Sequence, residues 1–183
     1  MSKENADKEQ KRSFKREVFS WIACIVVTIL LTEFILNFVI INANIPSGSM
    51  ENTIMTNDKL IALRTSYWFN DPKRGDIIIF KYPDDETEWF IKRVIALPGE
   101  TVLVKDGKVY INGSKKALSE PYIKEEPVED FGPYKVPKNG YFVMGDNRNN
   151  SNDAREWETH YVSRDELLGK AWFRYYPSIK VIK

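Results

Sequence analysis

The sequence contains very little cysteine and histidine, with one residue of each in 183. Cys24 lies inside an apolar run, so the rest of the chain has no disulfide and no thiolate chemistry. The same scarcity excludes zinc-finger spacings and a histidine-rich metal cluster. The net charge is only +1, and no strong overall field favours a nucleic-acid partner. We therefore expect no metal site and no binding of nucleic acid.

One long apolar run is present, at residues 18–41, and its 24 mostly apolar residues are enough to cross about 30 Å of hydrocarbon as a helix. A cleaved signal peptide would have an apolar core of about 7–15 residues and a small-residue cleavage site. This run is longer, and the best candidate site, residues 41–43, has the bulky Ile41 at a position that needs a small residue. We predict an uncleaved anchor.

Basic residues precede this run, namely Lys11, Arg12, Lys15 and Arg16. Basic flanks remain in the cytoplasm, so the predicted arrangement is a cytoplasmic tail at 1–17, a single transmembrane helix at 18–41 and an extracytoplasmic domain at 42–183, which places the protein in the cell membrane. Glu33 and Asn37 lie on one face of the helix. Either Glu33 reaches water at the outer interface, or the pair makes a contact with another helix.

Short segments with β patterning follow the anchor. We predict strands at 59–64, 77–82, 89–97, 101–104, 108–111, 141–144, 170–176 and 180–182. Asp106-Gly107 is typical of a primed hairpin turn, residues 119–137 form an extended loop with four prolines, and residues 165–168 form one helical turn. The aromatic residues 67–69 either form a belt at the membrane interface or pack in the core. The fold class is mostly β, barrel-like or sandwich-like.

The stretch 45–54 reads Ile-Pro-Ser-Gly-Ser-Met-Glu-Asn-Thr-Ile. Pro46 fixes one φ angle and Gly48 permits a wide range of them, so the backbone can bend sharply and present the hydroxyls of Ser47 and Ser49. The stretch is either a simple turn that leaves the anchor or the site of a nucleophile, Ser49. A serine nucleophile requires a base from elsewhere in the chain.

Two residues are candidates for that base. His160 stands in Trp-Glu-Thr-His-Tyr, where no glycine or strand pattern directs it toward a site, so we interpret it as a surface or packing residue. A lysine serves as a base only when burial lowers its pKa. Lys92 shares a predicted strand face with Phe90, Val94 and Ala96, whereas Arg93 points to the other face. The alternative is that Lys92-Arg93 is the exposed end of an edge strand.

Four motifs occur in order behind the anchor: Pro-Ser-Gly-Ser-Met at 46–50, Arg-Gly-Asp-Ile-Ile-Ile-Phe at 74–80, Phe-Ile-Lys-Arg-Val-Ile-Ala-Leu-Pro-Gly-Glu at 90–100 and Gly-Asp-Asn-Arg-Asn-Asn-Ser-Asn-Asp-Ala-Arg at 145–155. From the anchor to about Arg155, the chain resembles type I bacterial signal peptidase, a membrane-bound Ser/Lys peptidase. Its compact size is similar to the Gram-positive form, which lacks a large second domain.

The resemblance implies a serine endopeptidase that removes signal peptides from exported precursors at the lipid bilayer, without metal or organic cofactor. Ser49 would be the nucleophile and Lys92 the general base. The Ser47 hydroxyl and the Ser49 N–H would stabilise the oxyanion. The remaining implied roles are a hydrogen bond from Ser151 to Lys92, a supporting ion pair of Asp153 with Arg155, and a substrate pocket lined by Ile45, Met50, Leu60, Ile79 and Ile91.

The chain departs from the family pattern at a few positions. Asn52 stands where proline is frequent, Asn57 where glycine is usual, and Ala154 where serine is common. Residues 156–160 also differ from the usual aromatic–glycine sequence. Two other functions fit the sequence, a Ser/Lys self-cleaving regulator and a non-enzymatic membrane-anchored β scaffold. A plain solvated turn is the alternative for the loop at 145–155.

Overall fold

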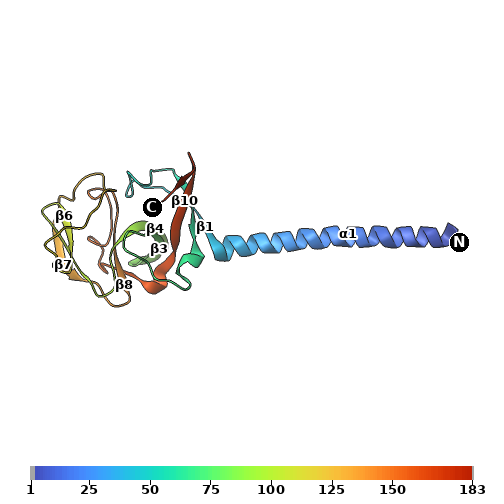
Figure 1. The fold of residues 1–183 in the computed structure, drawn as a ribbon, viewed down its shortest axis with the longest axis horizontal. Coiled ribbons are helices and arrows are strands. Elements are labelled where there is room, and N and C mark those ends of the chain that lie inside the picture. Colours follow the sequence, from blue (N-terminus) through green and yellow to red (C-terminus); the bar gives the residue numbers. More distant parts are fainter. Residues whose placement is uncertain (1–2, 183) are drawn as a thin grey trace. The chain divides into compact units, whose positions relative to one another are not determined.

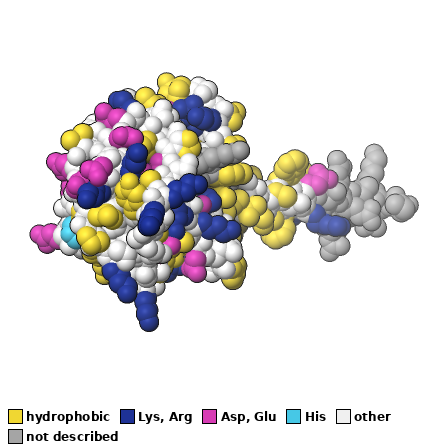
Figure 2. Space-filling model, turned by 60° about the vertical axis from the view of Figure 1, so that its left-hand side comes forward, with side chains coloured by type: hydrophobic (Ala, Val, Ile, Leu, Met, Phe, Trp, Pro, Cys, Tyr) yellow, Lys and Arg dark blue, Asp and Glu magenta, His cyan; other side chains and the backbone are white. Residues whose placement is uncertain are grey.

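The N-terminal part is one long helix. The computed structural model describes residues 3–182 and the side chains of 14–182. Helix α1, Lys3–Phe34, continues into the π-helical turn η1, Ile35–Val39. By length and composition, Phe14–Val39 is the one helix of the described chain able to cross a membrane. Apolar side chains cover most of this segment, and apart from Glu33 its described charged side chains, those of Lys15, Arg16 and Glu17, lie at its N-terminal end (Figure 2). The side chains of Lys11 and Arg12 lie outside the described set.

Glu33 has a partner within its own helix. The Asn37 side-chain amide donates to the Glu33 carboxylate at 3.1 Å and to the Glu33 carbonyl oxygen at 2.8 Å. This hydrogen bond crosses the boundary between α1 and the π-helical turn. The pairing meets part of the carboxylate's hydrogen-bonding demand without another helix, which is a solution that neither sequence interpretation included.

The predicted anchor extends two residues too far. Ile40 and Ile41 belong to strand β1, Ile40–Asn44, and pair with Leu63 and Ala62 of strand β2, Lys59–Leu63. Ile41 is 4% exposed because it packs in the core of the β domain. Two isoleucines suit a buried strand as well as a membrane helix, so apolar character alone does not locate this boundary.

The second compact unit starts at Ile40 and is mostly β, as predicted. An eight-stranded antiparallel sheet has the order β1-β2-β10-β3-β4-β8-β9, with β11 paired to β10, and a three-stranded sheet has the order β6-β5-β7. Figure 1 labels β1, β10, β3, β4 and β8 of the first sheet and β6 and β7 of the second. The remaining bounds are β3 Ile77–Tyr82, β4 Asp85–Ala96, β5 Thr101–Lys105, β6 Lys108–Ile111, β7 Phe131–Lys135, β8 Gly140–Met144, β9 Val162–Ser163, β10 Leu167–Tyr176 and β11 Lys180–Val181.

Three differences from the predicted strands concern β4, β9 and β7. Strand β4 begins four residues before the predicted start, because residues 85–88 are exposed and polar and carry no apolar signal. Strand β9 was not predicted, because its two residues, Val162 and Ser163, are too few to show a strand pattern. Strand β7 lies within the predicted loop at 119–137, and Gly132 has φ +92°, so a Cβ there would lie 2.7 Å from the Val102 carbonyl oxygen. This irregular pairing requires a glycine at 132. Because glycine is typical of loops, the sequence of β7 resembles a loop more than a strand.

The turn chemistry agrees with the sequence. Asp106 and Gly107 have φ angles of +49° and +75°, the left-handed values that a primed hairpin turn requires. The helical turn predicted at 165–168 is the 3-10 turn η3, Arg164–Glu166, and it ends earlier because Leu167 and Leu168 belong to strand β10, which begins three residues before its predicted start. Its N-cap, Ser163, and Glu166 form a reciprocal capping box.

The aromatic residues 67–69 divide between the core and the surface. Tyr67, the last residue of the 3-10 turn η2 (Arg64–Tyr67), is buried, and its hydroxyl donates to Asp76 at 3.1 Å. Burial raises the pKa of Tyr67. Trp68 is 54% exposed and Phe69 is 91% exposed. Core packing is therefore correct for Tyr67. Of these three residues, only Trp68 and Phe69 are exposed enough to contact a membrane surface.

Candidate active site

The segment that carries Ser49 is held by main-chain hydrogen bonds at its two ends and by hydrogen bonds from Asn147. The Ile45 and Asp58 main chains extend the ladder between β1 and β2, with the Ile45 N–H donating to the Asp58 carbonyl at 3.0 Å. From the opposite direction, the Asn147 N–H donates to the Ser49 carbonyl at 3.0 Å, and the Asn147 side chain donates to the Gly48 carbonyl at 3.0 Å. The candidate nucleophile therefore lies on a loop with a determined backbone position.

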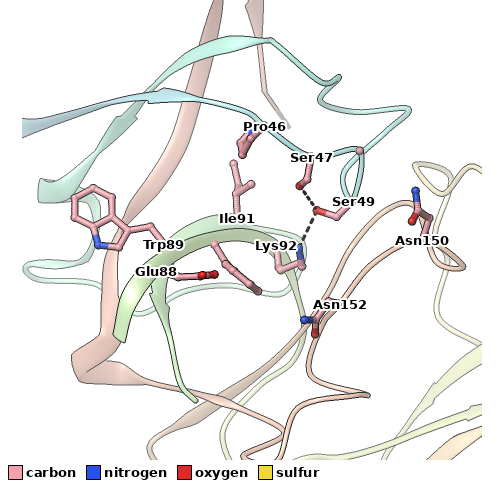
Figure 3. Close-up of a pocket in the computed structure, with 11 residues that line it drawn as sticks. Pro46, Ser47, Ser49, Glu88, Trp89, Ile91, Lys92, Asn150 and Asn152 are labelled. Carbon is pink, nitrogen blue, oxygen red and sulfur yellow. Dashed lines mark hydrogen bonds between the residues drawn. The ribbon is translucent and has the colours of Figure 1, made fainter. Parts of the chain in front are cut away.

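Lys92 is on an interior strand. Strand β4 pairs with β3 on one side and with β8 on the other, and Lys92 and Arg93 are 4% and 2% exposed. The alternative of an exposed edge is wrong. The Lys92 Nζ atom lies 2.8 Å from the Ser49 Oγ atom (Figure 3). Two residues that are 43 positions apart in the sequence thus form a hydrogen-bonded pair.

The environment of Lys92 favours a neutral amine. Burial lowers the pKa of Lys92 to about 8, and the charge of Asp153 opposes this shift. The Phe90 ring lies on the predicted common face, with its centroid 5.2 Å from Nζ. A lysine with this pKa is partly neutral near pH 7–8, so it can accept a proton from a serine hydroxyl.

Ser47 lies beside the pair. Its Oγ atom is 3.4 Å from the Oγ atom of Ser49, and both side chains line the same pocket. This placement is compatible with donation from the Ser47 hydroxyl to an oxyanion that forms at Ser49.

Ser151 does not make the hydrogen bond to Lys92 that the resemblance implies. Its buried hydroxyl has no hydrogen-bond partner among the described residues. The side chain packs on the backbone of Gly145, where an added Cβ would lie 2.2 Å from the Ser151 Oγ atom and 2.4 Å from the Ser49 carbonyl oxygen. The Lys92 amine bonds to Ser49 instead, and the position of Ser151 depends on the absence of a side chain at 145.

Asp153 and Arg155 form a bidentate ion pair, with Nε–Oδ1 and NH2–Oδ2 distances of 2.8 and 2.9 Å. The Asp153 carboxylate also accepts the Gly145 N–H at 2.9 Å. The Arg155 guanidinium donates to the Arg148 carbonyl at 2.6 Å. The ion pair thus fixes both ends of the loop that contacts Ser49 through Asn147.

Two further buried ion pairs support this loop, and the sequence analysis did not identify them. Arg93 bonds Asp146 at 2.8 and 2.7 Å, and Arg148 bonds Glu120 at 2.9 and 2.6 Å. The loop is therefore not a solvated turn. An available signal was the position of Arg93, which shares a strand face with Ile91 and Ile95, because a buried arginine requires an acidic partner.

The pocket differs in its lining from the prediction. A cavity of about 520 Å³ opens at the Ser49–Lys92 pair, the candidate dyad. It is lined by Pro46, Ser47, Gly48, Ser49, Glu88, Trp89, Phe90, Ile91, Lys92, Asn150 and Asn152. Of the predicted lining residues, only Ile91 is part of it. The other four, Ile45, Met50, Leu60 and Ile79, are at most 4% exposed and pack in one core cluster beneath the site. Their apolar character serves the core that supports the Ser49 loop.

The departures from the family pattern have structural correlates. Asn52 has φ +86°, an angle that proline cannot adopt, and its side chain donates to the Tyr122 carbonyl at 2.9 Å. Asn57 has φ +69°, the left-handed conformation in which glycine is usual. Ala154 is fully buried, so a serine there would place a hydroxyl in the core. These changes leave the dyad geometry intact.

His160 does not take part in the site. Its Nδ1 atom bonds the Ala154 carbonyl at 2.7 Å, and its ring packs edge-on against Phe131 and Tyr134. The residue also has φ +56°. It is a packing residue, in agreement with the sequence interpretation.

Comparison with known proteins identifies the family. The sequence model of the family described as "Signal peptidase, peptidase S26" matches residues 18–176, which is most of the chain. The chain belongs to this family. The resemblance noted in the sequence is confirmed, and the protein is a serine peptidase.

Two sequence relatives agree with this assignment. A probable signal peptidase I-2 of Synechocystis sp. is 44% identical over 161 residues, which cover 85% of this chain and 72% of that protein. A signal peptidase I of Bacillus amyloliquefaciens is 34% identical over 185 residues, which cover 96% of this chain and 97% of that protein. A crystal structure of a signal peptidase I from Enterococcus faecalis matches with 35% identity and a TM-score of 0.48, over 55% of this chain and 97% of that one.

Proposed function

We propose that this signal peptidase removes N-terminal signal peptides from exported precursor proteins, with Ser49 as the nucleophile and Lys92 as the general base. The observation that carries the proposal is the 2.8 Å contact between the Ser49 hydroxyl and a buried lysine whose pKa is lowered to about 8. The names of the relatives support the choice of substrate, since they are signal peptidases.

The geometry suggests the order of the steps. The neutral Lys92 amine takes the Ser49 hydroxyl proton while Oγ attacks the scissile carbonyl carbon, and negative charge develops on the carbonyl oxygen. The Ser47 hydroxyl and the Ser49 N–H stabilise that charge. The Lys92 ammonium then gives its proton to the leaving nitrogen, and the C–N bond breaks to leave an ester on Ser49. Lys92 next deprotonates a water molecule, which hydrolyses the ester and restores the free hydroxyl.

The direct test uses the full chain in liposomes with one precursor that carries a signal peptide. The product is isolated, and its new N-terminus is determined by sequencing. We expect a single cut that separates the signal peptide from the mature protein. Cleavage of the added chain itself, with the precursor left intact, would instead support a self-cleaving regulator.

We also propose that the tail at 1–17 is cytoplasmic and that the β domain, with Ser49, lies outside the cytoplasm. The support is the basic flank before the apolar helix, which includes Lys15 and Arg16. In intact cells, a tag at residue 1 should resist added protease, whereas a tag at residue 183 should be removed. The opposite pattern of protection would contradict this orientation.

Ser47→Ala is expected to slow processing by about 10²–10³-fold, the usual effect of removing one oxyanion donor. The substitution removes a hydroxyl 3.4 Å from the nucleophile and leaves the Ser49–Lys92 contact in place. Steady-state kinetics on a peptide substrate measure the change. An unchanged kcat would show that the Ser49 N–H and other groups suffice for the oxyanion.

A further inference from the structure

The pocket extends to both sides of the dyad. Glu88 and Trp89 line one end, whereas Asn150 and Asn152 line the other, with Ser49 and Lys92 between them (Figure 3). The proposed chemistry uses only the centre of this cavity. A peptide bound across the dyad must place residues from one side of the scissile bond beside the asparagines.

The orientation of the Asn152 amide is fixed by chemistry. The Trp157 Nε1 atom lies 2.7 Å from the Asn152 Oδ1 atom. An indole N–H can only donate a hydrogen bond, so the amide atom that faces it must be the oxygen. The Asn152 amide nitrogen, with its two N–H donors, consequently faces away from Trp157. Because Asn152 lines the pocket, these donors are available to a bound ligand.

Trp157 is held in place firmly enough to orient this amide. It is 2% exposed, and its ring packs against Phe80, Tyr82 and Phe90 at centroid distances of 5.8, 5.4 and 6.0 Å. Phe90 also lies beneath the Lys92 amine. One aromatic cluster therefore supports both the proposed base and the Asn152 side chain.

The two sides of the scissile bond can be assigned from the proton transfers. In the tetrahedral intermediate, the oxyanion points to Ser47, and the leaving nitrogen must face Lys92, which supplies its proton. In Figure 3, Lys92 lies between Ser47 and Asn152, and all three residues line the pocket. The asparagine end of the pocket thus adjoins the leaving group, which is the start of the mature protein.

We propose that the Asn152 amide nitrogen donates a hydrogen bond to a main-chain carbonyl of the substrate, in the first residues after the scissile bond. This inference rests on the proposed function. Trp157 acts as a positioning residue through Asn152. A contact to the main chain does not depend on the side chains of the mature protein, which suits an enzyme whose products have many different N-termini.

The test compares two substrates with the same residues before the scissile bond. The long substrate continues with four residues of mature sequence, and the short substrate ends in a methyl ester, which has no such carbonyl and needs less activation. We expect Asn152→Ala to lower kcat/KM for the long substrate by about twofold to tenfold, the range supplied by one neutral hydrogen bond. It should leave kcat/KM for the short substrate unchanged.

Three variants sharpen the comparison. Asn152→Asp keeps an acceptor for Trp157 but replaces the donors with an oxygen, so it should lose at least as much on the long substrate. Trp157→Phe removes the indole N–H, but its ring also packs on Phe90 beneath Lys92, so its loss on the short substrate measures any disturbance of the base. The additional loss on the long substrate should be smaller than that of Asn152→Ala. Asn149→Ala is the matched control, because its amide bonds the Glu126 carbonyl and it does not line the pocket.

An equal loss on both substrates would overturn the proposal, since it would indicate a disturbed dyad. Unchanged kinetics of Asn152→Ala on both substrates would overturn it as well. A failure of the proposed function looks different, because wild-type protein would then cleave neither substrate, or Ser49→Ala would cleave both.

Discussion

Ser49→Ala is expected to abolish precursor processing while the β domain stays folded. The Oγ atom is the side-chain group of this residue that is assigned to the chemistry, and it contacts Lys92 and Ser47. The Ser49 main chain, held by Asn147, is unaffected by the change. Loss of a serine nucleophile in a comparable peptidase lowers kcat by about 10⁶-fold, so we expect no processing above background.

The measurement is conversion of a purified precursor over time, together with a thermal unfolding curve for each protein. His160→Ala is the matched control, because its side chain bonds the Ala154 carbonyl away from the dyad. It should process the precursor at close to the wild-type rate. Processing by Ser49→Ala would show that Ser49 is not the nucleophile, whereas an inactive but folded His160→Ala would return the histidine to consideration as the base.

The strands of the domain were largely predictable from local patterns. A run rich in β-branched and aromatic residues locates β3 at 77–82 with both bounds correct, and the left-handed turn at Asp106-Gly107 follows from its residue types. Strand β7 was not predictable, because the glycine and proline in its middle are adapted to irregular pairing with β5. Such a strand has a tertiary cause that a window of sequence does not contain.

The strand face of Lys92 was likewise predictable from a local pattern, whereas its surroundings in the folded protein were not. The period of two along β4 places Lys92 on the face of Phe90, and the structure has that arrangement. The burial that lowers its pKa depends on β8 and the loop after it, about 50 residues later in the chain. The pocket lining was predicted from apolar character, which does not distinguish a core residue such as Met50 from a pocket residue such as Ile91.

The second large effect concerns Lys92. Lys92→Arg is expected to remove activity at every pH at which the protein is folded, because a guanidinium retains its proton and cannot accept one from Ser49. The charge is preserved, so a purely electrostatic role of Lys92 would leave substantial activity. The assay is kcat/KM for a peptide substrate, compared between the wild type and this variant. An active Lys92→Arg enzyme would show that Lys92 is not the base.

Stability supplies a control for the loss of activity. The folded-state pKa of Lys92 is about 8, against 10.5 as the ordinary value. Below pH 8 the amine is protonated in both the folded and the unfolded state, so the full desolvation penalty opposes folding. That penalty disappears as the pH rises from 8 to 10.5. Lys92→Met should therefore be inactive and yet more stable at pH 7, by up to about 3 kcal/mol in the free energy of unfolding.

The wild-type pH profile tests the same group without a substitution. Only the neutral amine accepts the Ser49 proton, so kcat/KM should rise about tenfold per pH unit well below the pKa of Lys92 and level off above it. With a pKa of about 8, the bend should lie near pH 8. A bound substrate excludes more water from the amine and lowers its pKa further, so the bend in kcat should lie at a lower pH than the bend in kcat/KM. A rise that continues unchanged to pH 10 would mean that the reacting lysine is solvated, in conflict with its 4% exposure.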